Sequence, residues 1–241
     1  MLSRTSCHPN VTEETLEELV ARLPEPPPTP PDGLPLGNRR DPFAELIYIL
    51  LTLMTRSRGS IEKAYGHLLE LTDGRLDELD DVPIDDLVLA LRPVGLVNRR
   101  AHQLRAIAAA CRPAERFTEE LRLASTSDVL RTLRSLPGVG AKTAKCVAMY
   151  SLDRDVLPVD IHVLRVAKRI GLVPEAVSWT QADALLETVV PAHLKRDVHV
   201  RFVAHGRDTC TSSRPNCSIC PIAPMCPSRG TDGQPRRHFV G

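Results

Sequence analysis

The segment Leu136-Pro137-Gly138-Val139-Gly140 constrains the fold of this chain more than any other part of its sequence. It lies between two stretches with helical patterning, so we expect a tight hairpin that joins two helices. A Gly-x-Gly turn that leads into a helix directs backbone N–H groups outward, as phosphate-binding sites do. The same turn also occurs as a plain αα corner, so the hairpin alone leaves both interpretations open.

Two polar residues follow this hairpin at positions that suggest chemistry. Lys142 stands two residues after Gly140, and Asp160 lies at the start of a further expected helix, in Val159-Asp160-Ile161-His162. An amine that can act as a nucleophile, a phosphate anchor and a carboxylate together indicate chemistry on a nucleic-acid sugar. The structural alternatives are a solvated surface lysine and an aspartate that only caps its helix.

Four cysteines near the C-terminus form the pattern C-x6-C-x2-C-x5-C within 17 residues: Cys210, Cys217, Cys220 and Cys226. Such density predicts one metal centre. Zinc sites usually contain two separated C-x2-C pairs, whereas only one pair here has that spacing, and an iron–sulfur cluster accepts unequal spacings more readily. Disulfide pairing is the alternative, and it is disfavoured because no secretory signal is apparent and a reducing compartment is expected.

These motifs together resemble the endonuclease III branch of the helix-hairpin-helix DNA glycosylases. The resemblance rests on LPGVGAKTAK (136–145), VDIHVLRV (159–166), HGRDTC (205–210) and the four cysteines, with weaker similarity in 41–51 and 93–101. It implies an all-α, two-lobed fold with a helical-barrel domain and a [4Fe-4S] cluster domain. It also implies that Lys142 is a Schiff-base nucleophile, that Asp160 is the catalytic carboxylate, and that the four cysteines hold the [4Fe-4S] cluster.

The same resemblance assigns DNA contacts. Gly138, Val139 and Gly140 would bind the DNA backbone, and Leu96 in the GLVN turn would insert into the base stack. A leucine that is simply buried at the start of a helix is the alternative for Leu96. For His162, which matches the family's D-x-H motif, we favour a structural hydrogen bond over a catalytic role.

The domain organisation that the resemblance implies has two lobes, with Lys142 and Asp160 facing each other across a cleft. The Pro-rich segment, with seven prolines from Pro24 to Pro35, is expected to be an extended tether that lets the first helix reach the C-terminal lobe. The expected parts are an N-terminal helix that packs on the cluster domain (1–23), the tether (24–40), the helical-barrel domain (41–154), the cluster domain (155–226) and a flexible tail (227–241).

Helical patterning runs through most of the chain, and no period-2 alternation lasts long enough to indicate a sheet. Asn10 and Glu13 are expected to cap the first helix. A strongly apolar helix should begin with Asp41 as its cap and extend through Met54, inside the core. Further helices are expected near 60–72, 84–91, 98–111, 127–135, 141–152, 160–170, 180–189 and 193–205.

The formal net charge is only +1, so any contact with nucleic acid must come from a local basic surface. Two stretches, between Asp86 and Glu115 and between Asp128 and Asp153, contain no acidic residue. A solvated charged face is the alternative for any one of their basic residues. These residues are Arg92, Arg99, Arg100, Arg105, Arg112, Arg131, Arg134, Lys142 and Lys145.

The chain departs from the family pattern at Leu53-Met54-Thr55-Arg56-Ser57. Relatives carry here a glutamine that fills the space left by an extruded base, and Met54 takes its place. A thioether supplies volume but cannot pair with the orphaned base as an amide can. Met54 is therefore expected to act as a purely steric wedge or, alternatively, as a core residue.

The function predicted from these features is base-excision repair by a bifunctional DNA glycosylase and abasic-site lyase, which removes oxidised pyrimidines and cuts by β-elimination through a lysine Schiff base. The alternative is a lyase or damaged-DNA-binding protein with weak or no glycosylase activity, because of the Met54 segment. A monofunctional glycosylase is disfavoured because Lys142 is present. We expect a monomer that binds damaged double-stranded DNA in the cytoplasm, associated with the nucleoid, and no membrane-spanning segment.

Overall fold

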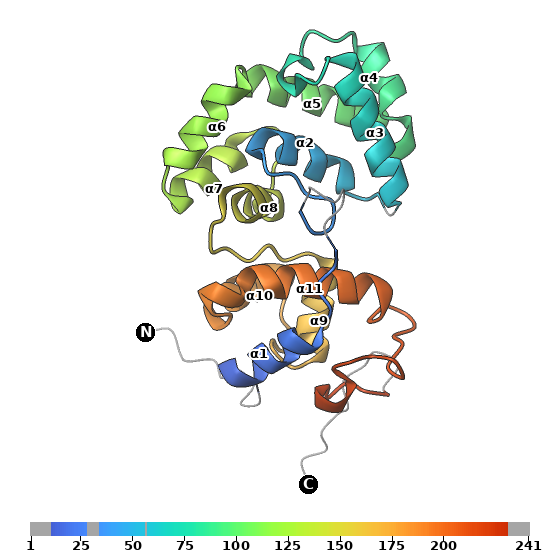
Figure 1. Cartoon of the computed structure of the whole chain (residues 1–241), viewed down its shortest axis with the longest axis vertical. Coiled ribbons are helices and arrows are strands. Elements are labelled where there is room, and N and C mark those ends of the chain that lie inside the picture. Colours follow the sequence, from blue (N-terminus) through green and yellow to red (C-terminus); the bar gives the residue numbers. More distant parts are fainter. Residues whose placement is uncertain (1–10, 28–33, 56, 231–241) are drawn as a thin grey trace. The chain divides into compact units, whose positions relative to one another are not determined.

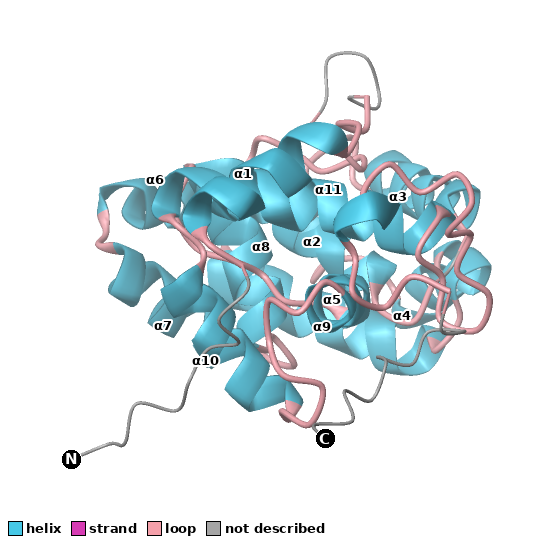
Figure 2. Cartoon of the chain, turned by 90° about the horizontal axis from the view of Figure 1, so that it is seen from below, coloured by secondary structure: helices cyan, strands magenta, loops and turns pink. Residues whose placement is uncertain are grey.

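The computed structural model describes residues 11–27, 34–55 and 57–230 (Figure 1). Within these residues the chain forms eleven α-helices and four short 3-10 helices, with no β-strand (Figure 2). The all-α prediction is therefore confirmed. No helix among the described residues is long and apolar enough to cross a membrane.

The described residues divide into two compact units, one of residues 34–154 and the other of residues 11–27 together with 155–230. The first unit contains α2 (Pro42–Thr52), α3 (Arg58–Leu71), α4 (Ile84–Ala90), α5 (Val97–Cys111), α6 (Ala114–Leu123), α7 (Thr126–Ser135) and α8 (Ala141–Leu152). The second contains α1 (Glu13–Arg22), α9 (Ile161–Arg169), α10 (Trp179–Val189) and α11 (Lys195–Asp208). The 3-10 helices are Leu76–Glu78, Arg92–Val94, Ala192–Leu194 and Ala223–Met225.

Helix α2 is the core of the first unit. It begins where Asp41 accepts a hydrogen bond from Ala44 N, 2.8 Å away, with Pro42 at the first helical position. Its apolar residues point in all directions and are almost completely buried, so α2 must be enclosed by other helices. Figure 1 shows it surrounded by α3, α5, α6 and α8 within this unit.

The segment before α2 is folded against the same core, contrary to the expectation that the tether extends to residue 40. Leu34 and Asn38 are buried, and the amide of Leu34 donates to the carbonyl of Asn38. The Arg39 guanidinium lies over the rings of Tyr48 and Tyr65, at 4.3 and 4.7 Å from their centroids. Residues 34–40 therefore belong to the folded part of the first unit, because a buried leucine and a cation–π pair fix the chain there.

In the second unit, α9 and α11 pack closely because α11 contains a glycine at the contact. A Cβ atom at Gly206 would lie 2.8 Å from the Cβ of His162, closer than two such atoms approach. Helix α1 lies in the same unit and is tied to α11, where Arg201 donates to the carbonyl of Leu23. Its buried side chains are Leu16, Leu19 and Val20.

Three expectations about local structure were wrong. Helix α2 ends at Thr52 and does not continue through Met54. Helix α6 was not predicted at all, although Thr118 and Leu121 give it a buried face. The first helix is capped by Thr12, whose hydroxyl accepts a hydrogen bond from Thr15 N; Asn10, the expected cap, lies outside the described residues.

Candidate active site and metal centre

The predicted hairpin lies between α7 and α8. The amide of Val139 donates to the carbonyl of Leu136 at 3.2 Å, and this bond closes the turn. Gly138 has a φ of 68°, and a Cβ atom there would lie 2.4 Å from Nε2 of Gln103. That amide in turn donates to the carbonyl of Pro137 at 2.9 Å. The left-handed backbone favours glycine at position 138, whereas the Gln103 amide ends a flexible side chain that can move aside.

Lys142 is the second residue of α8 and its side chain is half-buried. Gly140 is the N-cap of this helix, with no side chain to cap the first amides, so the positive end of the helix dipole is open toward Lys142. Beyond Lys142 the helix is buried from Thr143 to Tyr150. The side chain of Val139 is only 6% exposed, so Val139 shapes the turn from the inside.

A buried carboxyl group near Lys142 was missed by sequence reasoning. Glu45, in the first turn of α2, is completely buried, and its Oε2 accepts a hydrogen bond from Arg39 N at 2.6 Å. Burial holds the pKa of Glu45 well above its usual range, although this hydrogen bond and the charges of Lys142 and Arg39 oppose the shift. A glutamate within an apolar helix was the only sequence signal, and nothing local distinguished it from a surface residue.

Asp160 is the N-cap of α9. Its Oδ1 accepts hydrogen bonds from the amides of His162 and Val163, both at 2.8 Å. Nδ1 of His162 lies 3.0 Å from Nη2 of Arg165, and burial lowers the pKa of His162 although the charge of Asp160 opposes this. The capping geometry of Asp160 and the hydrogen bond of His162 agree with the structural interpretations given above, and a cap does not exclude a catalytic carboxylate.

Two arginines one turn apart on α9 connect this helix to the cysteine-bearing loop. Arg165 donates through Nε to the carbonyl of Cys210 at 2.9 Å and through Nη2 to the carbonyl of Gly206 at 2.6 Å. Arg169, buried, donates to Sγ of Cys210 at 3.2 Å and to the carbonyl of Thr211 at 2.7 Å. Sequence reasoning missed both residues, whose only signal was their i, i+4 spacing in an amphipathic helix.

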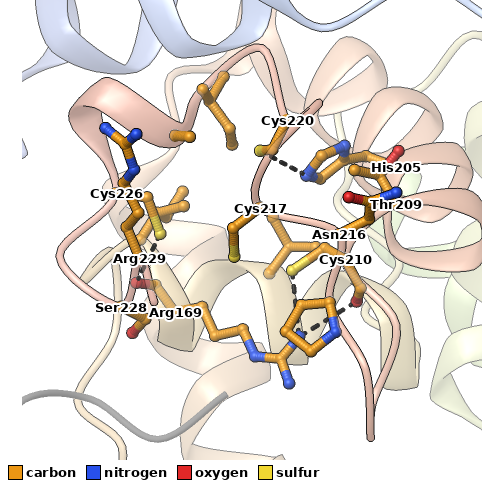
Figure 3. Close-up of a pocket in the computed structure, with 15 residues that line it drawn as sticks. Arg169, His205, Thr209, Cys210, Asn216, Cys217, Cys220, Cys226, Ser228 and Arg229 are labelled. Carbon is orange, nitrogen blue, oxygen red and sulfur yellow. Dashed lines mark hydrogen bonds between the residues drawn. The ribbon is translucent and has the colours of Figure 1, made fainter. Parts of the chain in front are cut away.

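The four cysteines of the C-terminal motif line one pocket in the second unit (Figure 3). All four are free thiols, which disagrees with the disulfide alternative. Their surroundings combine apolar side chains with nitrogen groups, since Cys220 Sγ lies 3.6 Å from Nε2 of His205. The pocket is lined by Val166, Arg169, Ile170, His205, Thr209, Cys210, Pro215, Asn216, Cys217, Cys220, Ile222, Ala223, Cys226, Ser228 and Arg229.

The chemistry of this pocket fits a bound cation. Burial raises the pKa of Cys226 to about 11 and also raises that of Cys220, and the neighbouring cysteines raise both further. The thiols of Cys220 and Cys226 therefore resist ionisation unless a positive centre binds them. An all-sulfur donor set in an apolar pocket suits a soft metal centre such as zinc or an iron–sulfur cluster.

Met54 and Leu96 are both exposed to solvent, with relative exposures of 89% and 56%. Both have left-handed backbones, with φ of 58° and 51°. Such a conformation costs about 1 kcal/mol or more for a bulky residue. The expectations that Met54 belongs to a core helix and that Leu96 is simply buried are therefore wrong. Arg56, in the same segment as Met54, lies outside the described residues.

The basic surface is smaller than the sequence suggested. Arg100 and Lys145 are buried, and Arg112 forms ion pairs with Asp80 and Asp81 at 3.1 and 2.6 Å. Arg105 donates to the carbonyl of Asp80, and Arg131 pairs with Asp128. The exposed basic residues that remain from the two stretches are Arg92, Arg99 and Arg134.

Comparison with known proteins gives a consistent result. Residues 56–192 match the family model described as HhH-GPD superfamily base excision DNA repair protein. Endonuclease III of Escherichia coli strain K12 is 30% identical over 209 residues, which cover 87% of this chain and 93% of that protein. Endonuclease III of Treponema pallidum is 31% identical over 191 residues, covering 78% and 84% of the two chains.

Solved structures agree at the level of the fold. A trapped endonuclease III–DNA covalent intermediate superimposes with a TM-score of 0.71 at 22% identity, covering 93% of this chain and 100% of that one. A thermostable thymine-DNA glycosylase gives 0.70 at 21% identity, covering 88% and 93%. The family match spans the hairpin, Lys142 and Asp160, and the relatives cover most of the chain. The chain therefore belongs to the endonuclease III family of the HhH-GPD superfamily, and it is a base-excision repair DNA glycosylase of that type.

Proposed function

We propose that this chain is a bifunctional enzyme, which removes oxidised pyrimidines from duplex DNA and cleaves abasic sites through a Schiff base on Lys142. The observation that carries this proposal is the half-buried lysine in the first turn of α8, directly behind a Gly-x-Gly hairpin. The hairpin and the open amides of α8 provide a place for a DNA phosphate, which brings the sugar near the amine. The likeness to a covalent endonuclease III–DNA intermediate supports the same chemistry.

The proposed reaction begins with nucleophilic attack and ends with release of the lysine. The Lys142 amine attacks C1′ of the extruded nucleotide, the glycosidic bond breaks, and the base leaves with the bonding electron pair and takes up a proton. The sugar ring opens as the nitrogen forms an imine with C1′. A proton then leaves C2′, the 3′ phosphate departs, and water hydrolyses the imine to free the lysine. No oxidant or reductant is required.

Lys142 attacks only as a neutral amine, and Glu45 bears on this requirement. Because burial raises the pKa of Glu45, this carboxyl group favours its neutral form and places little negative charge beside the amine.

Asp160 is proposed to stabilise the cationic sugar that develops as the base leaves. The two amides of α9 that bond to its Oδ1 favour the ionised carboxylate and fix its orientation. Arg165 and His162 hold the same helix to α11 through the carbonyl of Gly206, so the carboxylate stands on a rigid support.

We propose that Cys210, Cys217, Cys220 and Cys226 hold a [4Fe-4S] cluster. The chain offers four thiols around one pocket and an N–H donor to Cys210 Sγ from Arg169. A cluster whose irons are all bound by cysteine offers no open position to a substrate, so its role would be to order the loop after α11. We further propose the domain boundaries of the sequence analysis, with residues 34–40 assigned to the helical-barrel domain. We also propose a monomer bound to damaged double-stranded DNA and a cytoplasmic location.

A second candidate function is an abasic-site lyase or damaged-DNA-binding protein with little glycosylase activity. Met54 favours it, because an exposed thioether stands where relatives are expected to present an amide. Excision requires that a base be unpaired and held outside the helix, whereas an abasic site contains no base to extrude. Loss of the amide should therefore weaken excision more than strand cleavage.

Borohydride reduction of protein mixed with abasic-site DNA tests the main proposal. It should trap a covalent complex with the wild type and none with Lys142→Ala, because only the lysine amine forms the imine. Asp160→Asn should retain DNA binding and turn over far more slowly, by roughly a hundredfold if it removes transition-state charge stabilisation. An adduct of undiminished yield in Lys142→Ala, or near-normal turnover in Asp160→Asn, would refute these assignments.

A further inference from the structure

Met54 and Leu96 share an unusual combination of features in the first unit. Each is a large apolar residue, each is exposed, and each has a left-handed backbone that only glycine adopts without strain. Burial of these side chains does not stabilise the two turns. Some other part of the unit must therefore hold them.

The side chain of Arg100 holds the turn that contains Met54. Its guanidinium is buried, and Nη1 donates to the carbonyls of Leu50 and Leu51 at 2.8 and 2.9 Å. Nη2 donates to the carbonyl of Leu53 and to Oγ1 of Thr55, the latter at 3.2 Å. These carbonyls belong to the C-terminal end of α2, where a helix leaves acceptors open and favours a cation. The planar fork of arginine can bind several of them at once, as a lysine cannot.

Thr55 extends this network to the turn that contains Leu96. Its hydroxyl donates to the carbonyl of Val94 at 3.2 Å, and Val94 ends the 3-10 helix that leads into Gly95 and Leu96. The amide of Arg100 donates to the carbonyl of Leu96 at 3.0 Å. One continuous hydrogen-bond network therefore connects Leu53 and Thr55, which flank Met54, with Val94 and the carbonyl of Leu96.

We propose that Arg100 and Thr55 are positioning residues that hold Met54 and Leu96 as a fixed pair, ready to enter a DNA duplex where a nucleotide has left the stack. The inference rests on the proposed function, because it requires a damaged duplex as ligand. Apolar side chains that enter a base step do so at a cost in unstacking. A pair that is already ordered adds no further cost for immobilising its own backbone on binding.

Thr55→Val tests this assignment with little change in shape, because it removes the hydroxyl that joins the two turns. The matched control is Thr72→Val, which removes a more deeply buried hydroxyl bonded to the carbonyl of Leu68 at 2.9 Å, at the end of α3. Each variant is measured in single-turnover cleavage of an abasic site, once in a duplex and once in the same strand alone. A single strand has no partner stack to enter, so the lysine chemistry there needs no wedge.

Thr55→Val should slow duplex cleavage about fivefold, the effect of one hydrogen bond, and leave single-strand cleavage unchanged. Arg100→Lys should have a larger effect in the same direction. Thr72→Val should change neither rate. In a Met54→Ala, Leu96→Ala background, Thr55→Val should have no further effect on the duplex, because the groups that it positions are gone.

A 2-aminopurine placed opposite a tetrahydrofuran abasic analogue gives a second measurement, which needs binding but no catalysis. At saturating protein its fluorescence should be lower with Thr55→Val than with wild type, because the base stays stacked. Equal loss of duplex and single-strand cleavage, or an unchanged aminopurine signal, would show that the network only stabilises the fold. A wild type that cleaves neither substrate would refute the proposed function, and the aminopurine signal would still decide the role of Thr55.

Discussion

The hairpin before α8 and the turn after α2 are both short, left-handed turns at helix ends in the same unit, and they are built differently. In the hairpin the left-handed residue is Gly138, which adopts φ of 68° without strain. In the other turn it is Met54, held by Arg100 from the first turn of α5, a helix distant in the sequence. The hairpin is followed by the lysine that we propose as the nucleophile, whereas the Met54 turn presents a thioether where the family resemblance leads us to expect an amide.

This difference separates two parts of one reaction. The hairpin places an amine next to a turn that we propose binds a phosphate, and we expect this arrangement to suffice for attack on a sugar that is already accessible. We propose that the Met54 turn acts in the earlier step, in which a base must be unpaired and kept out of the stack. We therefore expect substitutions to fall into two groups, those that change both reactions in parallel and those that change their ratio.

The largest expected effect concerns the cysteine loop, and it should leave the ratio unchanged. Purified protein should contain about four iron atoms per chain and absorb broadly at about 400 nm. Cys217→Ser should lower the iron content and the thermal stability. Strand cleavage and base excision should fall together, because we propose that the cluster has a structural and DNA-positioning role and that its irons offer no open site to a substrate. Iron analysis, thermal unfolding and both assays are compared in the same preparations.

Anaerobically prepared protein with one zinc ion and no iron would contradict the cluster assignment. A Cys217→Ser protein that remains stable but changes the ratio of the two reactions would contradict the structural role.

A smaller effect should come from Met54→Gln, and it should change the ratio. The amide can pair with the orphaned base, so excision of thymine glycol should rise several-fold, by about 1 kcal/mol for a regained hydrogen bond, while abasic-site cleavage changes little. Met54→Ala should weaken both reactions. Leu123→Gln is the matched control, since it converts another exposed apolar residue of the same unit, 80% exposed, to an amide. A Met54→Gln protein with neither rate changed would show that Met54 is not a wedge.

The smallest expected effect concerns Glu45 beneath the hairpin helix. Burial holds the pKa of Glu45 in the folded protein above the pKa of the same carboxyl group in the unfolded chain. As the pH rises, the unfolded state therefore loses the carboxyl proton first, and the folded state is progressively disfavoured above about pH 4.3. The unfolding temperature of Glu45→Gln relative to wild type should therefore rise by a few degrees between pH 5 and pH 8. The exposed Glu119→Gln should show no such trend. A pH-independent difference for Glu45→Gln would contradict the raised pKa.

Sequence reasoning succeeded where the determinants were local. The bounds of α8 were predicted as they are observed, because Gly140 begins the helix and the apolar pattern continues to Leu152. The hairpin turn follows from Gly138 itself, and the four cysteines follow from their spacing.

It failed where a distant side chain decides the outcome. Helix α2 stops at Thr52 because its last carbonyls bond to Arg100, which lies 50 residues from Leu50 in the sequence. The same arginine was assigned to a basic surface, since composition cannot distinguish a buried cation from an exposed one. Glu45 was missed for the same reason: its burial depends on α8, which no pattern near residue 45 reveals.

The central claim is that this chain keeps the lysine chemistry of its family and has a weaker means of holding an extruded base. The most direct measurement is a pair of single-turnover rates for the wild type, on one duplex that carries an abasic site and on the same duplex that carries thymine glycol. The claim predicts that abasic-site cleavage is faster by about tenfold or more, since unpairing a base costs a few kcal/mol that an abasic site avoids. Equal rates on the two substrates would contradict it.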